Sequence, residues 1–144
     1  MNAIYPIRLS GHFWVREFRC KGEEEGKPCD CHGAVLVDQR LVDVLEAFRP
    51  VFGMPIHITS AYRCEGYNAA VGGHPKSWHR IGCAADITSP MVRRDLVLSS
   101  ERLGEVVEDV LGKGRGNVIR YLSRGFLHVD VGNRVAVDLV REVA

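Results

Sequence analysis

The segment SWHRIGCAAD, residues 77–86, places the strongest constraint on how this chain folds. Most of its residues are small or apolar and suit burial, yet it also carries His79 and Asp86. A polar or charged side chain inside a protein must find hydrogen-bond or ionic partners. Because Gly82 permits a bend between them, we expect His79 and Asp86 to converge from two elements that flank a turn.

Bulk properties indicate one globular domain over residues 1–144. The chain is 46% hydrophobic and 26% charged, which suits a single core of this size. Its formal net charge of +1 provides no overall field that would recruit nucleic acid or an anionic membrane. No stretch approaches the roughly 18 apolar residues of a membrane span, and no signal peptide is visible. We therefore expect a soluble monomer that is synthesised in the cytoplasm.

Hydrophobic periodicity predicts two amphipathic helices. From Asp38, a candidate N-cap, apolar residues recur at steps of three and four as far as Phe52. Pro50 and Gly53 then disfavour continuation of this helix. A second pattern of the same kind covers residues 101–111 and is followed by a glycine.

Four runs of residues predict strands. IHITSAYR begins a strand at about Ile56, and AADIT begins another at Ala84. NVIRYL and FLHVDV are separated by SRG, as expected for a hairpin. With a short helix over CEGYNAAV, this order predicts an α+β domain, a small antiparallel sheet flanked by helices.

The last of these strands divides its residues between two faces. Phe126, His128 and Asp130 share one face, and the residues between them form an apolar face. Alone, His128 could be a hydrogen-bonded core residue, and Asp86 could be a strand-end cap or an ion-pair partner. Together with His79 they supply two neutral nitrogens and an anionic oxygen. That set suits zinc with one open position for water.

A family resemblance rests on this segment. Its spacing resembles the S-x-H-x-x-G-x-A-x-D signature of zinc D-alanyl-D-alanine carboxypeptidases, a family that includes the L-alanyl-D-glutamate endopeptidases of phage lysins. The residues at the five fixed positions are Ser77, His79, Gly82, Ala84 and Asp86. FLHVDVG resembles the strand that supplies the third ligand, and ITSAYRCEGYNAAVGG resembles the substrate-side segment. EFRC also fits this branch. The resemblance covers about residues 13–132 and implies a hedgehog-like zinc peptidase fold.

The resemblance also implies roles for individual residues. It implies one catalytic zinc with a bound water as nucleophile, held by His79, Asp86 and His128. Arg63 matches an arginine that faces a substrate carboxylate, and a guanidinium fork suits that task. A structural ion pair is the alternative for Arg63. Tyr62 and Ser77 are further candidates for hydrogen bonds to substrate.

The general base is less clearly marked. Many relatives have an acidic residue three positions before the third ligand, or a histidine two before it, where this chain has Gly125 and Phe126. Asp130 lies two residues after His128 on the same predicted face. We therefore take Asp130 as the candidate base, and it could instead hydrogen-bond a ligand imidazole.

The chain has five cysteines, an odd number. Four of them, with His32 adjacent, could form a second, structural zinc site that pins the polar loop at residues 21–33 beside Arg63: Cys20, Cys29, Cys31 and Cys64. Their C-x8-C-x-C spacing differs from the usual pair of C-x2-C knuckles, so free or partly disulfide-bonded cysteines are the preferred interpretation. Cys83 is expected to be a small buried residue.

These features predict a zinc metallopeptidase that hydrolyses peptidoglycan stem peptides next to a D-amino acid. The choice between exopeptidase and endopeptidase stays open at this level. Two alternatives are a cell-wall-binding module that keeps the metal without catalysis, and a phage structural component. A phage or prophage lysin, or an exported protein whose leader is missing, would fit the sequence.

Overall fold

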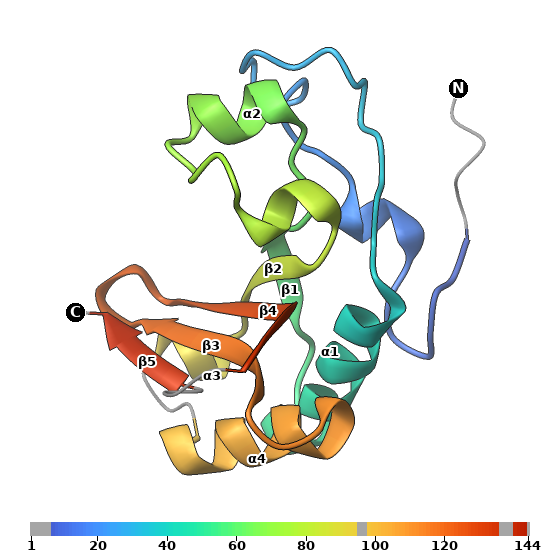
Figure 1. Ribbon diagram of the computed structural model, residues 1–144. Helices are drawn as coiled ribbons and strands as arrows, with labels where there is room; N and C mark the ends of the chain where they lie inside the picture. The colour runs from blue at the N-terminus through green and yellow to red at the C-terminus, as the bar shows by residue number, and fades with distance from the viewer. Residues whose placement is uncertain (1–6, 95–97, 136–139, 144) are drawn as a thin grey trace.

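The computed structural model describes residues 7–94, 98–135 and 140–143, and its centre is a five-stranded sheet (Figure 1). In spatial order the strands are β1 (His57–Ser60), β2 (Ala84–Thr88), β4 (Phe126–Val135), β3 (Arg115–Tyr121) and β5 (Val140–Val143). The first four pair antiparallel, whereas β5 pairs parallel with β3. The predicted α+β class with a small antiparallel sheet is confirmed, and the parallel edge strand β5 is an addition to it.

The two helices predicted from periodicity are α1 (Gln39–Phe52) and α4 (Ser100–Leu111). Asp38 caps α1 as expected, because its side chain accepts a hydrogen bond from the backbone N–H of Arg40. Pro50 lies inside the last turn of α1, and the helix ends at Gly53 with a left-handed φ of 68°. The stop signal is therefore Gly53 and not Pro50.

The remaining helices are short. The predicted helix over CEGYNAAV is α2 (Glu65–Ala70), while α3 (Pro90–Arg93) was not expected. Three 3-10 helices complete the described elements: η1 (Val15–Phe18), η2 (Trp78–Ile81) and η3 (Leu122–Arg124). None of the described helices is long and apolar enough to cross a membrane.

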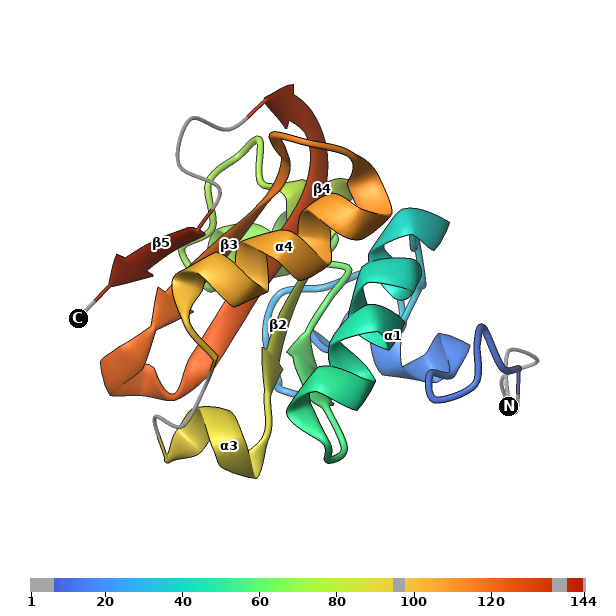
Figure 2. The same ribbon diagram turned by 90° about the horizontal axis from the view of Figure 1, so that it is seen from below.

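The core lies between the sheet and the pair of helices α1 and α4, which pack against each other on one face of the sheet (Figure 2). Both helices turn their apolar residues toward that face. The fully buried residues of the helices include Leu41, Leu45, Phe48, Leu103 and Val107, and those of the strands include Ala85, Ile87, Val118, Leu127 and Val129. Burial of each large apolar side chain contributes about 1.5–3 kcal/mol.

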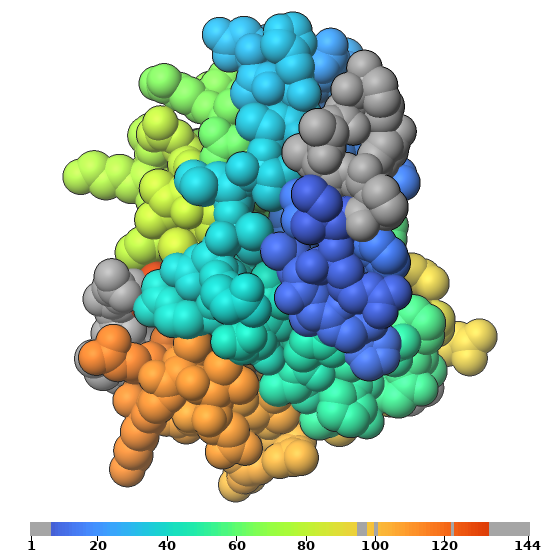
Figure 3. Space-filling model, turned by 90° about the vertical axis from the view of Figure 1, so that its right-hand side faces the viewer, coloured from blue at the N-terminus to red at the C-terminus, as the bar shows by residue number. Residues whose placement is uncertain are grey.

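The segment over residues 10–18 packs beside α1 (Figure 3). Glu46 of α1 accepts hydrogen bonds from the backbone N–H and the side chain of His12, at 2.7 Å each, and from the hydroxyl of Ser10. These contacts fasten the segment that leads into Phe13 and Phe18, two fully buried rings of the core.

The register of the sheet brings polar residues together on the face opposite the helices. Asp86 of β2 is paired with His128 of β4, and Ala84 is paired with Asp130. Every residue of β2 is buried, because η2 contacts the strand on this second face. The period of two along β4 thus sends Leu127 and Val129 into the core and His128 and Asp130 to the other side.

Gly82, at the end of η2, permits a close approach of two chain segments. Its φ is +77°, and an added Cβ would lie 2.4 Å from the carbonyl oxygen of Leu36. The Gly82 carbonyl also accepts a hydrogen bond from the N–H of Asp38, at 2.9 Å. The residue therefore joins the start of α1 to the turn that precedes β2.

We expect Gly82→Ala to lower the free energy of unfolding by more than Gly53→Ala does. Gly53 has a similar φ of +68° but nothing within 4 Å of an added Cβ. Its substitution should cost about 1–2 kcal/mol for left-handed backbone alone, and the contact with Leu36 should add about 1–3 kcal/mol at Gly82. Urea denaturation of both variants measures the difference. Equal losses would show that residues 36–37 yield to the methyl group without cost.

Candidate metal centre

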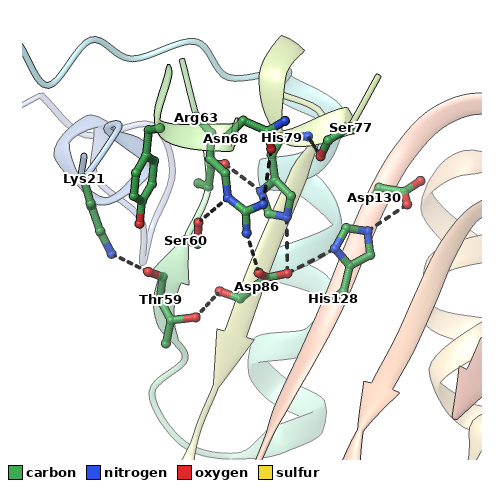
Figure 4. Close-up of polar contacts among 12 residues, drawn as sticks. Lys21, Thr59, Ser60, Arg63, Asn68, Ser77, His79, Asp86, His128 and Asp130 are labelled. Atoms are coloured by element: carbon green, nitrogen blue, oxygen red, sulfur yellow. Dashed lines mark hydrogen bonds and ion pairs between the residues drawn. The ribbon is translucent and has the colours of Figure 1, made fainter. Parts of the chain in front are cut away.

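Three side chains that the sequence singled out converge on one point (Figure 4). They come from three elements, with His79 on η2, Asp86 on β2 and His128 on β4. The carboxylate atom Oδ1 of Asp86 lies 3.3 Å from Nε2 of His79 and 3.1 Å from Nδ1 of His128. One donor atom from each residue lies within 4.8 Å of the others. The predicted convergence is present in the structure.

Local structure sets the orientation of His79. The hydroxyl of Ser77 caps η2 by accepting a hydrogen bond from the His79 N–H, at 3.2 Å. On the ring, Nδ1 lies 2.7 Å from the carbonyl oxygen of Ala61. Because a carbonyl only accepts, Nδ1 must carry the proton. The lone pair of Nε2 is therefore directed at the point where the three side chains meet.

His128 is held in the complementary tautomer. Its Nε2 lies 3.0 Å from Oδ2 of Asp130, so this nitrogen donates and Nδ1 faces Asp86. Asp130 is 1% exposed, and it accepts further hydrogen bonds from the N–H of Gly132 and the side-chain amide of Asn117. The Asp130 carboxylate thus fixes the rotation of the His128 ring.

Arg63 occupies the other side of Asp86. Its Nη2 donates to Oδ2 of Asp86 at 3.1 Å, and its Nε donates to the hydroxyl of Ser60 at 3.1 Å. Nη1 lies 3.5 Å from the side-chain oxygen of Asn68. The guanidinium therefore holds Asp86 in place, which is the ion-pair alternative that the sequence left open, while Arg63 also lines the adjacent cavity.

The pKa values reflect this crowding of charges. Burial raises the pKa of Asp86, but hydrogen bonds from His128 and His79 outweigh burial and hold it below its usual range. Burial lowers the pKa of His128, but its hydrogen bonds to Asp130 and Asp86 raise it to about 9. Two carboxylates around one imidazole thus favour positive charge at this position, as a proton or as a metal cation.

The donor set fits zinc. Ligand atoms at about 2.0–2.1 Å from a tetrahedral zinc ion lie roughly 3.3 Å apart, close to the 3.1 and 3.3 Å distances from Asp86 to the two imidazoles. Two neutral imidazole nitrogens and one carboxylate oxygen leave a fourth position open, as in catalytic zinc sites. Both imidazoles also have the second hydrogen bond that is typical of metal-bound histidine.

A cavity of about 350 Å³ opens onto this point. One wall is formed by residues 71–74, which follow α2, and the other by the hairpin between β3 and β4. The lining residues outside residues 71–74 are Arg63, Ser77, His79, Asp86, Tyr121, Arg124, Phe126 and His128. The volume lies within the range of small-molecule and peptide sites.

The hairpin wall contains an arginine that sequence reasoning missed. The guanidinium of Arg124 lies 5.2 Å from the ring of Phe126 and 5.9 Å from that of Tyr121. The two rings stack on each other with centroids 4.5 Å apart. The signal in the sequence is the position of SRG beside the ligand strand, because a hairpin turn lies at the same end of the sheet as the residues that flank it.

The other predicted residues lie as follows. Ser77 lines the cavity, and its contact with substrate stays a prediction. Tyr62 packs instead against the cysteines near α2 and is not among the lining residues. The ring of Trp78 lies over Gly132, where an added Cβ would approach it to 2.3 Å. Trp78 therefore packs on the backbone that donates to Asp130.

Comparison with known proteins assigns the family. A family model described as Peptidase M15 matches residues 11–130, a range that contains all three candidate ligands. Curated protein sequences give no match. The matched range covers most of the chain and ends at Asp130, which contacts the candidate ligand His128. The chain therefore belongs to the Peptidase M15 family and is a zinc metallopeptidase, a hydrolase that acts on peptidoglycan.

Proposed function

We propose that this peptidase cleaves peptidoglycan stem peptides next to a D-amino acid, as a D-alanyl-D-alanine carboxypeptidase or as an endolysin-type endopeptidase. The observation that supports this is a three-donor metal centre, His79, Asp86 and His128, at the base of a cavity of about 350 Å³. A zinc ion held there would polarise the scissile carbonyl and make a water acidic enough to attack it at neutral pH. The hydrogen bonds of both imidazoles orient the donors in advance.

Arg124 is the residue that we assign to a carboxylate of the substrate. It is exposed, it lines the cavity, and it stacks on aromatic rings that restrict its position. A guanidinium binds a carboxylate through two parallel hydrogen bonds. Arg63 contributes indirectly, because its Nη2 is engaged with the metal-side carboxylate of Asp86.

Asp130 acts, in this proposal, as a positioning residue. Its carboxylate lies on the far side of the His128 ring from Asp86 and is almost completely buried. Both of its oxygens already accept hydrogen bonds from protein groups. This placement supports orientation of His128 over removal of a proton from water, the role that the sequence suggested for Asp130.

Digestion of purified peptidoglycan tests the proposed reaction. We expect the zinc-loaded protein to release fragments whose new ends lie beside a D-amino acid, as identified by mass spectrometry. Chelation should abolish release, and added zinc should restore it, because the metal polarises the reacting carbonyl. Asp86→Asn should be inactive at ordinary zinc concentrations, since it removes the anionic ligand.

A matched control is Asp43→Asn, an exposed carboxylate on α1 that should leave turnover unchanged. Tight binding to peptidoglycan without any release by the zinc-loaded protein would contradict the proposed reaction. That result would support the cell-wall-binding module instead.

Asp130→Asn separates positioning from proton transfer. A carboxamide holds the His128 ring less strongly, so we expect zinc affinity to fall about 10–100-fold. Turnover at saturating zinc should stay within a few-fold of that of the unchanged protein. Competition with a chelator of known affinity measures the first quantity, and steady-state kinetics measure the second. Asp130 would be identified as the base if the variant kept its zinc affinity, lost turnover and showed a changed acidic limb in its pH–rate profile.

Arg124→Ala tests the carboxylate contact. With a peptide whose free C-terminal carboxylate adjoins the cleaved bond, we expect KM to rise by about tenfold or more, because the substitution removes both charge-assisted hydrogen bonds to that carboxylate. Amidation of that carboxylate should remove the difference between the two proteins. Arg102→Ala, an exposed arginine of α4, is the control. Equal KM values for Arg124→Ala and the unchanged protein would place carboxylate recognition elsewhere.

A further inference from the structure

Four of the five cysteines meet at a second point, away from the metal centre. They come from three parts of the chain. Cys20 is the second residue after η1, Cys29 and Cys31 lie in the loop that leads toward α1, and Cys64 is the N-cap of α2. The sulfur atoms all lie within 4.8 Å of one another, and the group, called here the cysteine cluster, consists of Cys20, Cys29, Cys31 and Cys64. Figure 1 shows the loop passing beside α2.

The spacing of the sulfurs is that of ligands around a single ion. Zinc–sulfur bonds of about 2.3 Å in a tetrahedron place the sulfurs roughly 3.8 Å apart. Sγ of Cys20 lies 3.8 Å from those of Cys29 and Cys64, and the Cys29–Cys64 distance is 3.6 Å. Cys29 and Cys31 are 3.3 Å apart. All five cysteines are free, so no pair has the roughly 2.05 Å separation of a disulfide.

Neighbouring residues hold the loop of the cysteine cluster against α2. Gly22 permits the close approach of the loop to α2, because an added Cβ would lie 2.6 Å from Cβ of Cys29 and 3.0 Å from Cβ of Tyr67. The Tyr67 hydroxyl donates to Glu25 at 2.7 Å, which fastens the loop to the helix. Tyr62 packs against the cluster as well. Four sulfurs around one point, with no nitrogen or oxygen donor among them, are typical of a structural site.

We propose that the cysteine cluster binds one structural zinc ion, in addition to the zinc of the catalytic centre. The sequence ranked this second, behind free or partly disulfide-bonded cysteines, because its spacing lacks C-x2-C pairs. Cys64, which supplies the fourth sulfur, lies 35 residues after Cys29 in the chain. His32 stays outside the cluster, exposed and 3.4 Å from Glu23.

The proposed ion would act on the catalytic centre through the chain. Cys64 directly follows Arg63, whose N–H donates to the carbonyl of His79 and whose side chain holds Asp86. Asn68 of α2 contacts the same guanidinium. Fixing the N-terminus of α2 to the loop therefore fixes the arginine that orients the anionic ligand.

Metal analysis of the full chain, purified with zinc supplied, tests this site. We expect about two zinc ions per chain in the unchanged protein and about one in Asp86→Ala/His128→Ala, which keeps the cysteine cluster. Cys29→Ser/Cys31→Ser should also retain about one, and Cys83→Ser, which changes the cysteine outside the cluster, should retain about two. Thiol titration after denaturation without oxygen should find every cysteine reduced.

The outcomes distinguish this site from the catalytic one. One zinc in the unchanged protein and none in Asp86→Ala/His128→Ala would overturn the proposal and leave the catalytic centre intact. Disulfides among the four cysteines in non-reducing mass spectrometry would overturn it too. Iron in place of zinc, with the visible absorption of an iron–thiolate centre, would overturn the choice of metal. Loss of zinc only in the cysteine variant would instead count against the catalytic centre.

Discussion

The carboxylate of Asp86 is the contact on which the rest of the site depends. It touches Arg63, His79 and His128, which come from three different segments of the chain. A buried carboxylate without partners would cost several kcal/mol, so the fold must supply positive or hydrogen-bonding groups around it. Each of those groups is in turn held by a second contact, to Asn68, Ala61 and Asp130 respectively. The resulting network connects η2, β2 and β4 across the second face of the sheet.

The same strands serve the core and the site. On β4, Leu127 and Val129, the residues on either side of His128, pack in the core against α1 and α4. The position of the candidate ligand His128 is therefore set by the packing of Leu127 and Val129, whose side chains are both almost wholly buried. Ala84, which lies on the same face of β2 as Asp86, has a small side chain that allows η2 to pack close to that face. Core packing and donor geometry cannot vary independently here.

Local patterns explain which features were predictable. The apolar periods of α1 and α4, the alternation along β4 and the cap at Asp38 all act within a few residues, and each has its expected effect in the structure. The contacts of Arg63 with Asp86, and of Tyr62 and Cys64 with the other cysteines, join segments that are far apart in sequence, and local periodicity cannot predict them. β5 escaped prediction for a similar reason, because its pairing with β3 is parallel and needs a long connection.

His128 lies between two carboxylates, and this determines its protonation in the metal-free protein. Burial opposes the imidazolium, but the hydrogen bonds to Asp130 and Asp86 raise its pKa to about 9, above the ordinary value of 6.5. A proton therefore stays on the ring at neutral pH in the metal-free chain, and its stabilising effect is lost only as pH rises toward that value. This proton compensates the negative charge of Asp86 and Asp130, as a bound metal cation would. Zinc bound by His79, Asp86 and His128 would take the place of this proton, so that loading of the centre would release it to solvent.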